Sequence, residues 1–209
     1  LHRVDRRQRQ MCIRDSPKKE KFIGGFYDKK EINTLFDIIQ GLPLEVAIKL
    51  AAFYGLRREE IIGLKWTAID FENNTLTIQH TVTECNLDGK HIEVASDTAK
   101  TDSSLRTMPL VTNFREMLLA KKEKQEHYRK LCGRSYCKEY LDYIFVNEMG
   151  ERWKPRYLSD GFKRILEQNG LRRIRFHDLR HTCASLLLAN NVPCLLYTSD
   201  AADDLLCVD

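Results

Sequence analysis

Helical spacing of apolar residues recurs along most of this chain and restricts it to a largely helical fold. The first segment opens with Asp28 and Glu31, whose spacing matches a capping box at a helix N-terminus. Pro43 fits the first turn of a second helix, and Asn113 with Glu116 repeats the capping pattern. The predicted helices after the first cover about residues 43–55, 57–64, 113–130, 159–169 and 177–190.

One stretch shows the alternation of a half-buried β-strand instead. Between residues 75 and 82, Leu76, Ile78 and Val82 fall on one face. The other signals of this kind are turns at 73–74 and 88–89, a pairing of 98–100 with 106–109, and a short strand at 143–146. The sequence therefore predicts an α+β fold that is mostly helical and has a small antiparallel β-sheet.

Composition places the chain among globular proteins. Of its 209 residues, 43% are hydrophobic and 31% are charged, and the net charge is only +4. We expect no membrane segment and no secretory signal, because no apolar run approaches a membrane span and the N-terminus is basic and polar. Seven cysteines without metal-ligand spacing predict reduced thiols and a cytoplasmic location.

The two ends differ from the rest of the chain. Residues 1–16 and 194–209 lack any helical or strand period, and both resemble translated sequencing-adapter sequence. We expect them to be non-native or disordered tails, which leaves residues 17–193 as one incomplete domain.

The most informative stretch for function is residues 175–182, which read Arg-Phe-His-Asp-Leu-Arg-His-Thr. Residues three apart share a helix face, so His177 and Arg180 are predicted to point the same way and to address one phosphate. Upstream, Arg57 stands at a predicted helix start, and Lys100 precedes the turn of a predicted hairpin.

This order, Arg…Lys…His-x-x-Arg, resembles the catalytic domain of the tyrosine recombinases, the phage-integrase family. The resemblance runs from about Pro17 to about Pro193. It implies cleavage and rejoining of double-stranded DNA through a 3′-phosphotyrosyl link, with no metal or nucleotide cofactor. It also implies that the full-length parent assembles as a tetramer on paired DNA sites.

The resemblance assigns a role to each candidate residue. Arg57 and Arg180 would hydrogen-bond the non-bridging oxygens of the scissile phosphate, with Arg180 partly exposed in the cleft. Lys100 would protonate the leaving 5′ oxygen, and His177 would donate to the phosphate or exchange a proton with the nucleophile. Glu60 and His181 would support these groups, and flanking phosphates would be contacted by Arg172, Arg173 and Arg175.

Several alternatives stay open. Arg58 competes with Arg57, and Lys90 competes with Lys100. The rival functions are a non-catalytic DNA-binding protein that keeps this fold, a type IB topoisomerase, and a helical module that binds RNA or an acidic protein.

The chain departs from the family pattern near its C-terminus. The nucleophilic tyrosine expected on a late helix is missing, and Tyr197, the only tyrosine after Arg180, follows too closely. We likewise expect the N-terminal core-binding domain of the family to be absent from this chain. We therefore expect this fragment to be inactive by itself.

Overall fold

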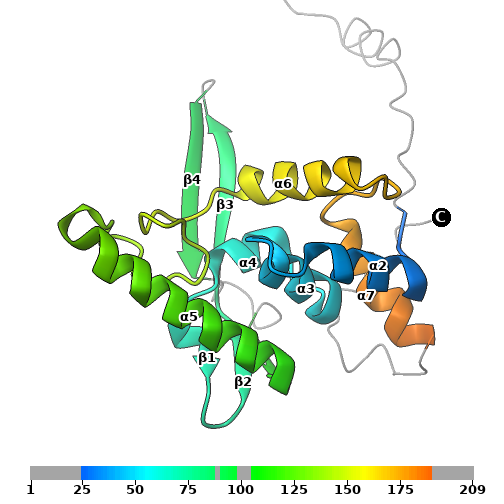
Figure 1. The fold of residues 1–209 in the computed structure, drawn as a ribbon, viewed down its shortest axis with the longest axis horizontal. Helices are drawn as coiled ribbons and strands as arrows, with labels where there is room; N and C mark the ends of the chain where they lie inside the picture. The colour runs from blue at the N-terminus through cyan, green and yellow to red at the C-terminus, as the bar shows by residue number, and fades with distance from the viewer. Residues whose placement is uncertain (1–24, 88–89, 98–104, 190–209) are drawn as a thin grey trace, which may run out of the picture.

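The computed structural model describes residues 25–87, 90–97 and 105–189. It confirms the predicted class, since helices predominate and the strands form two small antiparallel sheets (Figure 1). Its helices are α2 (Lys29–Ile39), α3 (Glu45–Tyr54), α4 (Arg58–Gly63), α5 (Thr112–Cys132), α6 (Pro155–Gln168) and α7 (Asp178–Ala189), with short 3-10 turns at Trp66–Ala68 and Gly133–Ser135.

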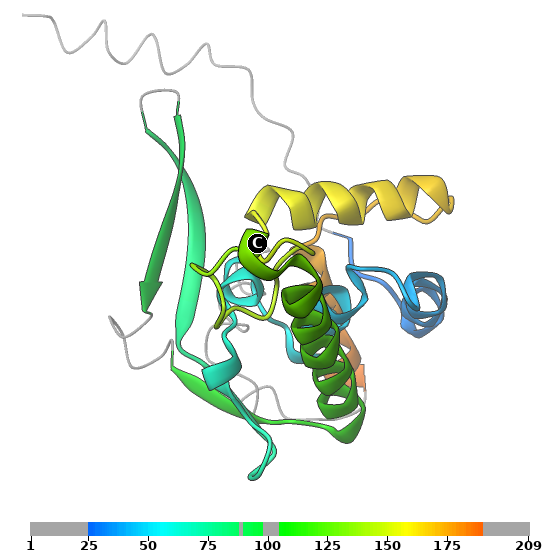
Figure 2. The same cartoon turned by 60° about the vertical axis from the view of Figure 1, so that its left-hand side comes forward.

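The strands divide into two sheets. The first has the order β1 (Ile69–Asp70), β2 (Thr75–Ile78), β5 (Arg106–Pro109), and the second is the hairpin of β3 (His80–Leu87) and β4 (Lys90–Asp97). The hairpin stands out from the helical body in both views (Figures 1 and 2).

The predicted strand over residues 75–82 is wrong in one respect, because it breaks at Gln79 into β2 and β3, which belong to different sheets. The burial alternation nevertheless holds, since Leu76, Ile78 and Val82 are all buried. The alternation of apolar residues predicts which face of a strand is buried, but the alternation does not identify the partner strand. β5 pairs with β2, whereas the predicted pairing with residues 98–100 lies outside the described residues, as does the turn at 88–89.

The helix starts show which local signals decide a boundary. The capping box at α2 is confirmed, with the Asp28 carboxylate accepting from the backbone of Lys30 and Glu31. The one predicted at Asn113 is wrong, because α5 begins at Thr112 after Val111 and has no side-chain cap. α3 begins at Glu45, two residues after Pro43.

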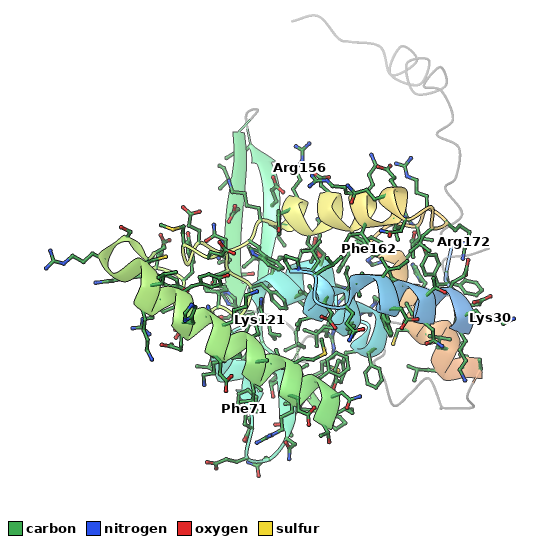
Figure 3. The ribbon with its side chains drawn as sticks, viewed as in Figure 1. Lys30, Phe71, Lys121, Arg156, Phe162 and Arg172 are labelled. Atoms are coloured by element: carbon green, nitrogen blue, oxygen red, sulfur yellow. The ribbon has the colours of Figure 1, made fainter. Side chains whose placement is uncertain are left out.

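The core lies where α3, α4, α6 and α7 meet. α3 packs against α7, and α4 packs against β3 and α6. Phe162 is buried on the side of α6 that faces α2 and α3, whereas Arg156 points away from the body (Figure 3). This arrangement places the start of α4 and the start of α7 at neighbouring ends of one packed unit.

None of the helices in the described ranges has the length and apolar composition that a membrane crossing requires. Both predicted tails, residues 1–16 and 194–209, lie outside the described residues, so the proposed domain limits stay a prediction.

Candidate active site

Arg57 stands at the junction between α3 and α4. It is the N-cap residue of α4 in extended conformation, and its backbone N–H donates to Glu60 Oε2 at 2.8 Å. Its Nη1 lies 3.4 Å from Glu60 Oε1, and 34% of the side chain is exposed. A carboxylate in the first turn of α4 therefore orients the arginine and leaves part of its side chain accessible.

Glu60 holds a second arginine more tightly. Arg106 on β5 donates from Nη1 at 2.9 Å and from Nη2 at 2.6 Å, one bond to each carboxylate oxygen of Glu60. Glu60 is 3% exposed, and a buried charge of this kind requires paired hydrogen bonds. One carboxylate thus connects Arg57 with the first residue of β5.

Sequence reasoning treated Arg106 only as part of a hairpin. A signal was available in the sequence, because Arg106 alternates with Met108 and Leu110 and therefore shares the apolar face of the predicted strand. In the structure, Arg106 is paired with the buried Ile78 across the β2–β5 ladder. An arginine on a buried face predicts a buried carboxylate partner.

Arg180 is held against the end of α3. Its Nη1 donates to the Gly55 carbonyl at 2.7 Å, and the residue is 4% exposed. The expectation of a partly exposed Arg180 is wrong, because α7 packs on α3 and covers this side chain. Gly55 ends α3 in the left-handed conformation, with φ of 62°, and stands two residues before Arg57. One short turn therefore contacts Arg180 and leads directly into Arg57.

Cys183, one α7 turn further on, reinforces this contact. Its Sγ donates to the Phe53 carbonyl at 3.1 Å, and burial raises the pKa of the thiol to about 11. The thiol is therefore uncharged at neutral pH and serves the α3–α7 packing.

The two histidines lie at the start of α7. His177 precedes the helix, and its carbonyl accepts from the Arg180 backbone at 3.0 Å. The His177 and His181 rings meet edge to face, with centroids 5.3 Å apart. His177 is exposed whereas Arg180 is buried, so the two side chains differ in their access to a ligand.

A groove of about 450 Å³ lies beside His177 between α4, α6 and the segment before α7. Its lining includes Arg58, Lys163, Arg173, Arg175 and His177. Arg57 and Arg180 are not among the groove's described lining residues. The structure therefore groups Arg173, Arg175 and His177 with the competing residue Arg58, and it groups Arg57 and Arg180 around Gly55.

Within this groove Arg58 has local partners. It pairs with Glu59 at 2.7 Å and donates to Ser159 Oγ on α6 at 3.0 Å. Arg175 is oriented by Asp178, a fully buried carboxylate that lies 2.9 Å from its Nη2.

Arg172 points elsewhere. It contacts Glu31 of α2 through Nε and Nη2, both at 2.8 Å, and lies over the Tyr27 ring. Hydrogen bonds from Arg172 lower the pKa of the Glu31 carboxyl. In this arrangement Arg172 joins α2 to the segment before α7, and its predicted DNA contact stays a prediction.

Lys100 lies outside the described residues, between Asp97 at the end of β4 and Arg106 at the start of β5. Its alternative, Lys90, is the first residue of β4. Tyr197 also lies outside the described residues. In the described part of the chain, no group of three or more His, Cys, Asp or Glu side chains is arranged to hold a metal ion.

Comparison with solved structures defines the class of this fold. It is shared by the Tn1549 transposon integrase solved in complex with a circular intermediate DNA, with a TM-score of 0.69 at 16% identity over 87% of this chain and 58% of that one. XerH site-specific recombinase bound to its palindromic substrate gives a TM-score of 0.54 at 22% identity, over 83% of this chain and 45% of that one. The fold is that of a tyrosine recombinase catalytic domain.

The sequence then identifies the family. The model of the phage integrase family matches residues 26–196, and the chain belongs to that family. A tyrosine recombinase XerC-like protein of Caldanaerobacter subterraneus is 29% identical over 80% of this chain and 44% of its own length. The prophage integrase IntR of Escherichia coli is 26% identical over 77% of this chain and 40% of its own length. The chain thus spans less than half the length of either relative.

Proposed function

We propose that the full-length parent of this chain cuts and rejoins double-stranded DNA at specific sites through a 3′-phosphotyrosyl intermediate. The observation that carries the proposal is the turn at Gly55, which contacts Arg180 and leads into Arg57. A guanidinium that contacts this turn and an arginine that follows it two residues later suit the two non-bridging oxygens of a single phosphate. Membership of the phage integrase family supports this assignment.

The proposed roles of the arginines follow from the negative charge that develops on the scissile phosphate. Attack on the phosphate places additional negative charge on the non-bridging oxygens, so the contacts from Arg57 and Arg180 strengthen in the transition state. His177 is exposed and is proposed to donate to the same phosphate or to exchange a proton with the nucleophile. Lys100 is proposed to protonate the leaving 5′ oxygen. The covalent link preserves the phosphodiester energy, so rejoining requires no nucleotide.

Flanking phosphates are proposed to bind at the groove beside His177. Four basic residues in its lining outnumber two acidic ones, Glu59 and Asp160; the basic residues are Arg58, Lys163, Arg173 and Arg175. Phosphate contacts of this kind position DNA without reading sequence. Assembly of the parent as a tetramer on paired sites is part of the same proposal.

A nicked DNA substrate tests the activity in the parent. Its short 5′-hydroxyl strand diffuses away after cleavage, so a covalent protein–DNA adduct accumulates on a denaturing gel. We expect Arg57→Ala and Arg180→Lys to slow adduct formation by roughly 10²–10³-fold. Arg180→Lys keeps a positive charge at the buried site, so unchanged melting would assign the loss to catalysis. DNA binding by the parent without any adduct would instead support a non-catalytic DNA-binding protein.

We propose further that the 209-residue chain by itself forms no adduct. A nucleophile must lie in line with the scissile phosphate, and the acidic residues around Tyr197 would repel the DNA backbone. An adduct that disappears in Tyr197→Phe would contradict this statement.

A further inference from the structure

The strand β5 carries a largely buried arginine to the start of α4. Arg106 is its first residue and lies opposite the buried Ile78 of β2. The far end of the strand is tied to α3, because the Tyr54 hydroxyl donates to the Pro109 carbonyl at 3.0 Å. Tyr54 is the last residue of α3 and precedes Arg57 by only three residues. The strand therefore holds Arg106 in a defined place relative to Arg57.

Glu60 divides its contacts unequally between these two arginines. Each of its carboxylate oxygens accepts a bond from the Arg106 guanidinium, at 2.9 and 2.6 Å. The contact from the Arg57 guanidinium is 3.4 Å long, whereas charge-assisted bonds of this kind are normally about 2.7–2.9 Å. Glu60 instead holds Arg57 chiefly through the Arg57 backbone N–H, at 2.8 Å. The guanidinium that neutralises Glu60 most closely is thus that of Arg106.

Burial separates the two arginines in the same way. The side chains of Arg106 and Glu60 are 10% and 4% exposed, whereas that of Arg57 is 34% exposed. A carboxylate as buried as Glu60 requires a paired cation. Arg106 supplies that cation from inside the domain, and Arg57 is the arginine of the three-residue cluster that solvent reaches more easily.

From these contacts we infer that Arg106 is a positioning residue for Arg57, an inference that rests on the proposed role of Arg57 at the scissile phosphate. By occupying both oxygens of Glu60, Arg106 keeps this carboxylate from pairing fully with Arg57. Glu60 can then orient the Arg57 backbone at the start of α4 without withdrawing the Arg57 guanidinium from the phosphate.

The loss of Arg106 would change both the charge and the pairing of this cluster. Two guanidinium groups and one carboxylate leave one positive charge in excess, and without Arg106 that excess is gone. The buried Glu60 would then pair with Arg57, the guanidinium already in contact with it. Binding of the phosphate by Arg57 would first have to break this pair, so less of the binding energy would stabilise the transition state.

A DNA substrate with a methylphosphonate at the cleavage site separates this role from a general loss of structure. A methyl group replaces one non-bridging oxygen, so the reacting group is uncharged and its transition state carries less negative charge. In the full-length parent, Arg57→Ala should slow cleavage of the phosphate by roughly 10²–10³-fold and of the methylphosphonate by less than about 10-fold. Both stereoisomers are measured, because each retains a different oxygen.

Arg106→Gln should show the same pattern, because it acts through Arg57. We expect a loss of about 10–10²-fold on the phosphate and of less than about 3-fold on the methylphosphonate. Adding Glu60→Gln to Arg106→Gln should recover most of the lost rate, since the carboxamide is neutral and the positive excess returns. Arg106→Lys keeps a charge at the buried site and serves as the test should Arg106→Gln fail to fold. Its ammonium lacks the bidentate fork, so it should lose less rate, again on the phosphate only.

Arg152→Gln is the matched control. Arg152 has a side chain that is 6% exposed, and it pairs at 2.7 Å with Glu93 of β4. The control therefore removes an equally buried arginine from a different carboxylate. Thermal melting establishes that every variant is folded at the assay temperature, and any slowing by Arg152→Gln should be the same on both substrates.

The outcomes separate two failures. If Arg57→Ala slows the methylphosphonate as much as the phosphate, Arg57 does not act on the non-bridging oxygens, and the inference fails together with that assignment. If Arg57→Ala shows the expected difference, three results would overturn the inference alone. These are normal cleavage of the phosphate by the Arg106 variants, equal slowing of both substrates by them, and no recovery on adding Glu60→Gln.

Discussion

At the scale of residues, Glu60 contacts two guanidinium groups on different elements. Arg57 belongs to the start of α4 and Arg106 to β5, and the carboxylate between them is 3% exposed. Removing one partner of a buried pair leaves the other charge uncompensated, which costs more than the pair contributes. Glu60 thus couples the stability of the domain to the orientation of Arg57.

Glu60→Gln should therefore lower the free energy of unfolding by about 3 kcal/mol. Urea denaturation of this chain measures the change. The matched control is Glu167→Gln, which removes a pair with Lys163 whose side chains are 55% and 52% exposed. A surface pair of this kind contributes little, so the control should change stability by less than about 0.5 kcal/mol. Equal effects of the two variants would show that Glu60 is not the buried connection described above.

Lys121 carries a second prediction at this scale. Its ammonium lies over both the Phe145 and the Trp153 rings, 5.1 and 5.0 Å from their centroids, on the inner side of α5 (Figure 3). Burial lowers the pKa of Lys121 from 10.5 to about 8. The lowered pKa means that folding favours the neutral amine, so this contribution to stability is present above pH 10.5 and is lost as pH falls to about 8.

Lys121→Met should therefore stabilise the domain at pH 7 by roughly 1–3 kcal/mol, the lower end applying if the ring faces offset much of the burial cost. The gain should shrink as the pH rises from about 8 towards 10.5. Lys122→Met is the control, since Lys122 lies on the exposed side of α5 over Trp66 and Phe71. Urea unfolding at pH 7 and pH 10 measures both variants, and a gain from Lys121→Met that does not depend on pH would contradict the assignment.

At the scale of elements, the sequence predicted helices well because their signal is local. The Asp28 cap and the apolar stripe of α6 lie within single segments, and no distant partner is needed to read them. The break between β2 and β3 was not predictable in this way, because strand partners are chosen by tertiary contacts. The expectation of a partly exposed Arg180 was wrong for the same reason, since the burial of this side chain depends on α7 packing against α3.

Gly63 tests the contact between α4 and β3. Gly63→Ala places a methyl group against the His80 backbone, which cannot move aside as a side chain would, so we expect a loss of about 1–3 kcal/mol. Gly161→Ala on α6 is the matched change, because its nearest neighbour at 2.5 Å is the flexible end of Leu44. The higher helix propensity of alanine offsets part of that cost. Thermal melting should show the larger decrease for Gly63→Ala, and the reverse order would mean that the two backbones separate readily.

At the scale of the whole molecule, charge is distributed unevenly. The net charge is only +4, yet Arg58, Lys163, Arg173 and Arg175 line one groove together with only two acidic residues, Glu59 and Asp160. Local charge of this kind binds phosphates by releasing counterions, which makes affinity fall steeply with salt. The net charge of the whole chain does not reveal this local positive charge, whereas the order of the motif residues indicated it.

This chain should therefore bind double-stranded DNA weakly, with little sequence preference and with affinity that decreases as salt increases. Replacing Arg173 and Arg175 with alanine should reduce the slope of log affinity against log salt by about 2, since each phosphate contact contributes about 0.9. Arg156 and Lys130 are exposed and outside the groove lining, so alanine there should leave most of the slope intact. Fluorescence anisotropy across a salt series measures the slopes. Affinity that is independent of salt would exclude phosphate contacts as the basis of binding.

The rung of His80 and Asp97, at the base of the hairpin where β3 contacts α4, also bears on how such a domain changes over evolution. β3 and β4 are both eight residues long and pair in register from His80–Asp97 outward. Residues added in equal number to both strands beyond Glu93, which pairs with Arg152, would lengthen the hairpin without moving that rung. Adding one residue to a single strand would instead reverse the faces of that strand beyond the addition. The reach of the hairpin and the spacing of the proposed catalytic residues can therefore diverge independently, and balanced insertions are the length changes that we expect this architecture to tolerate.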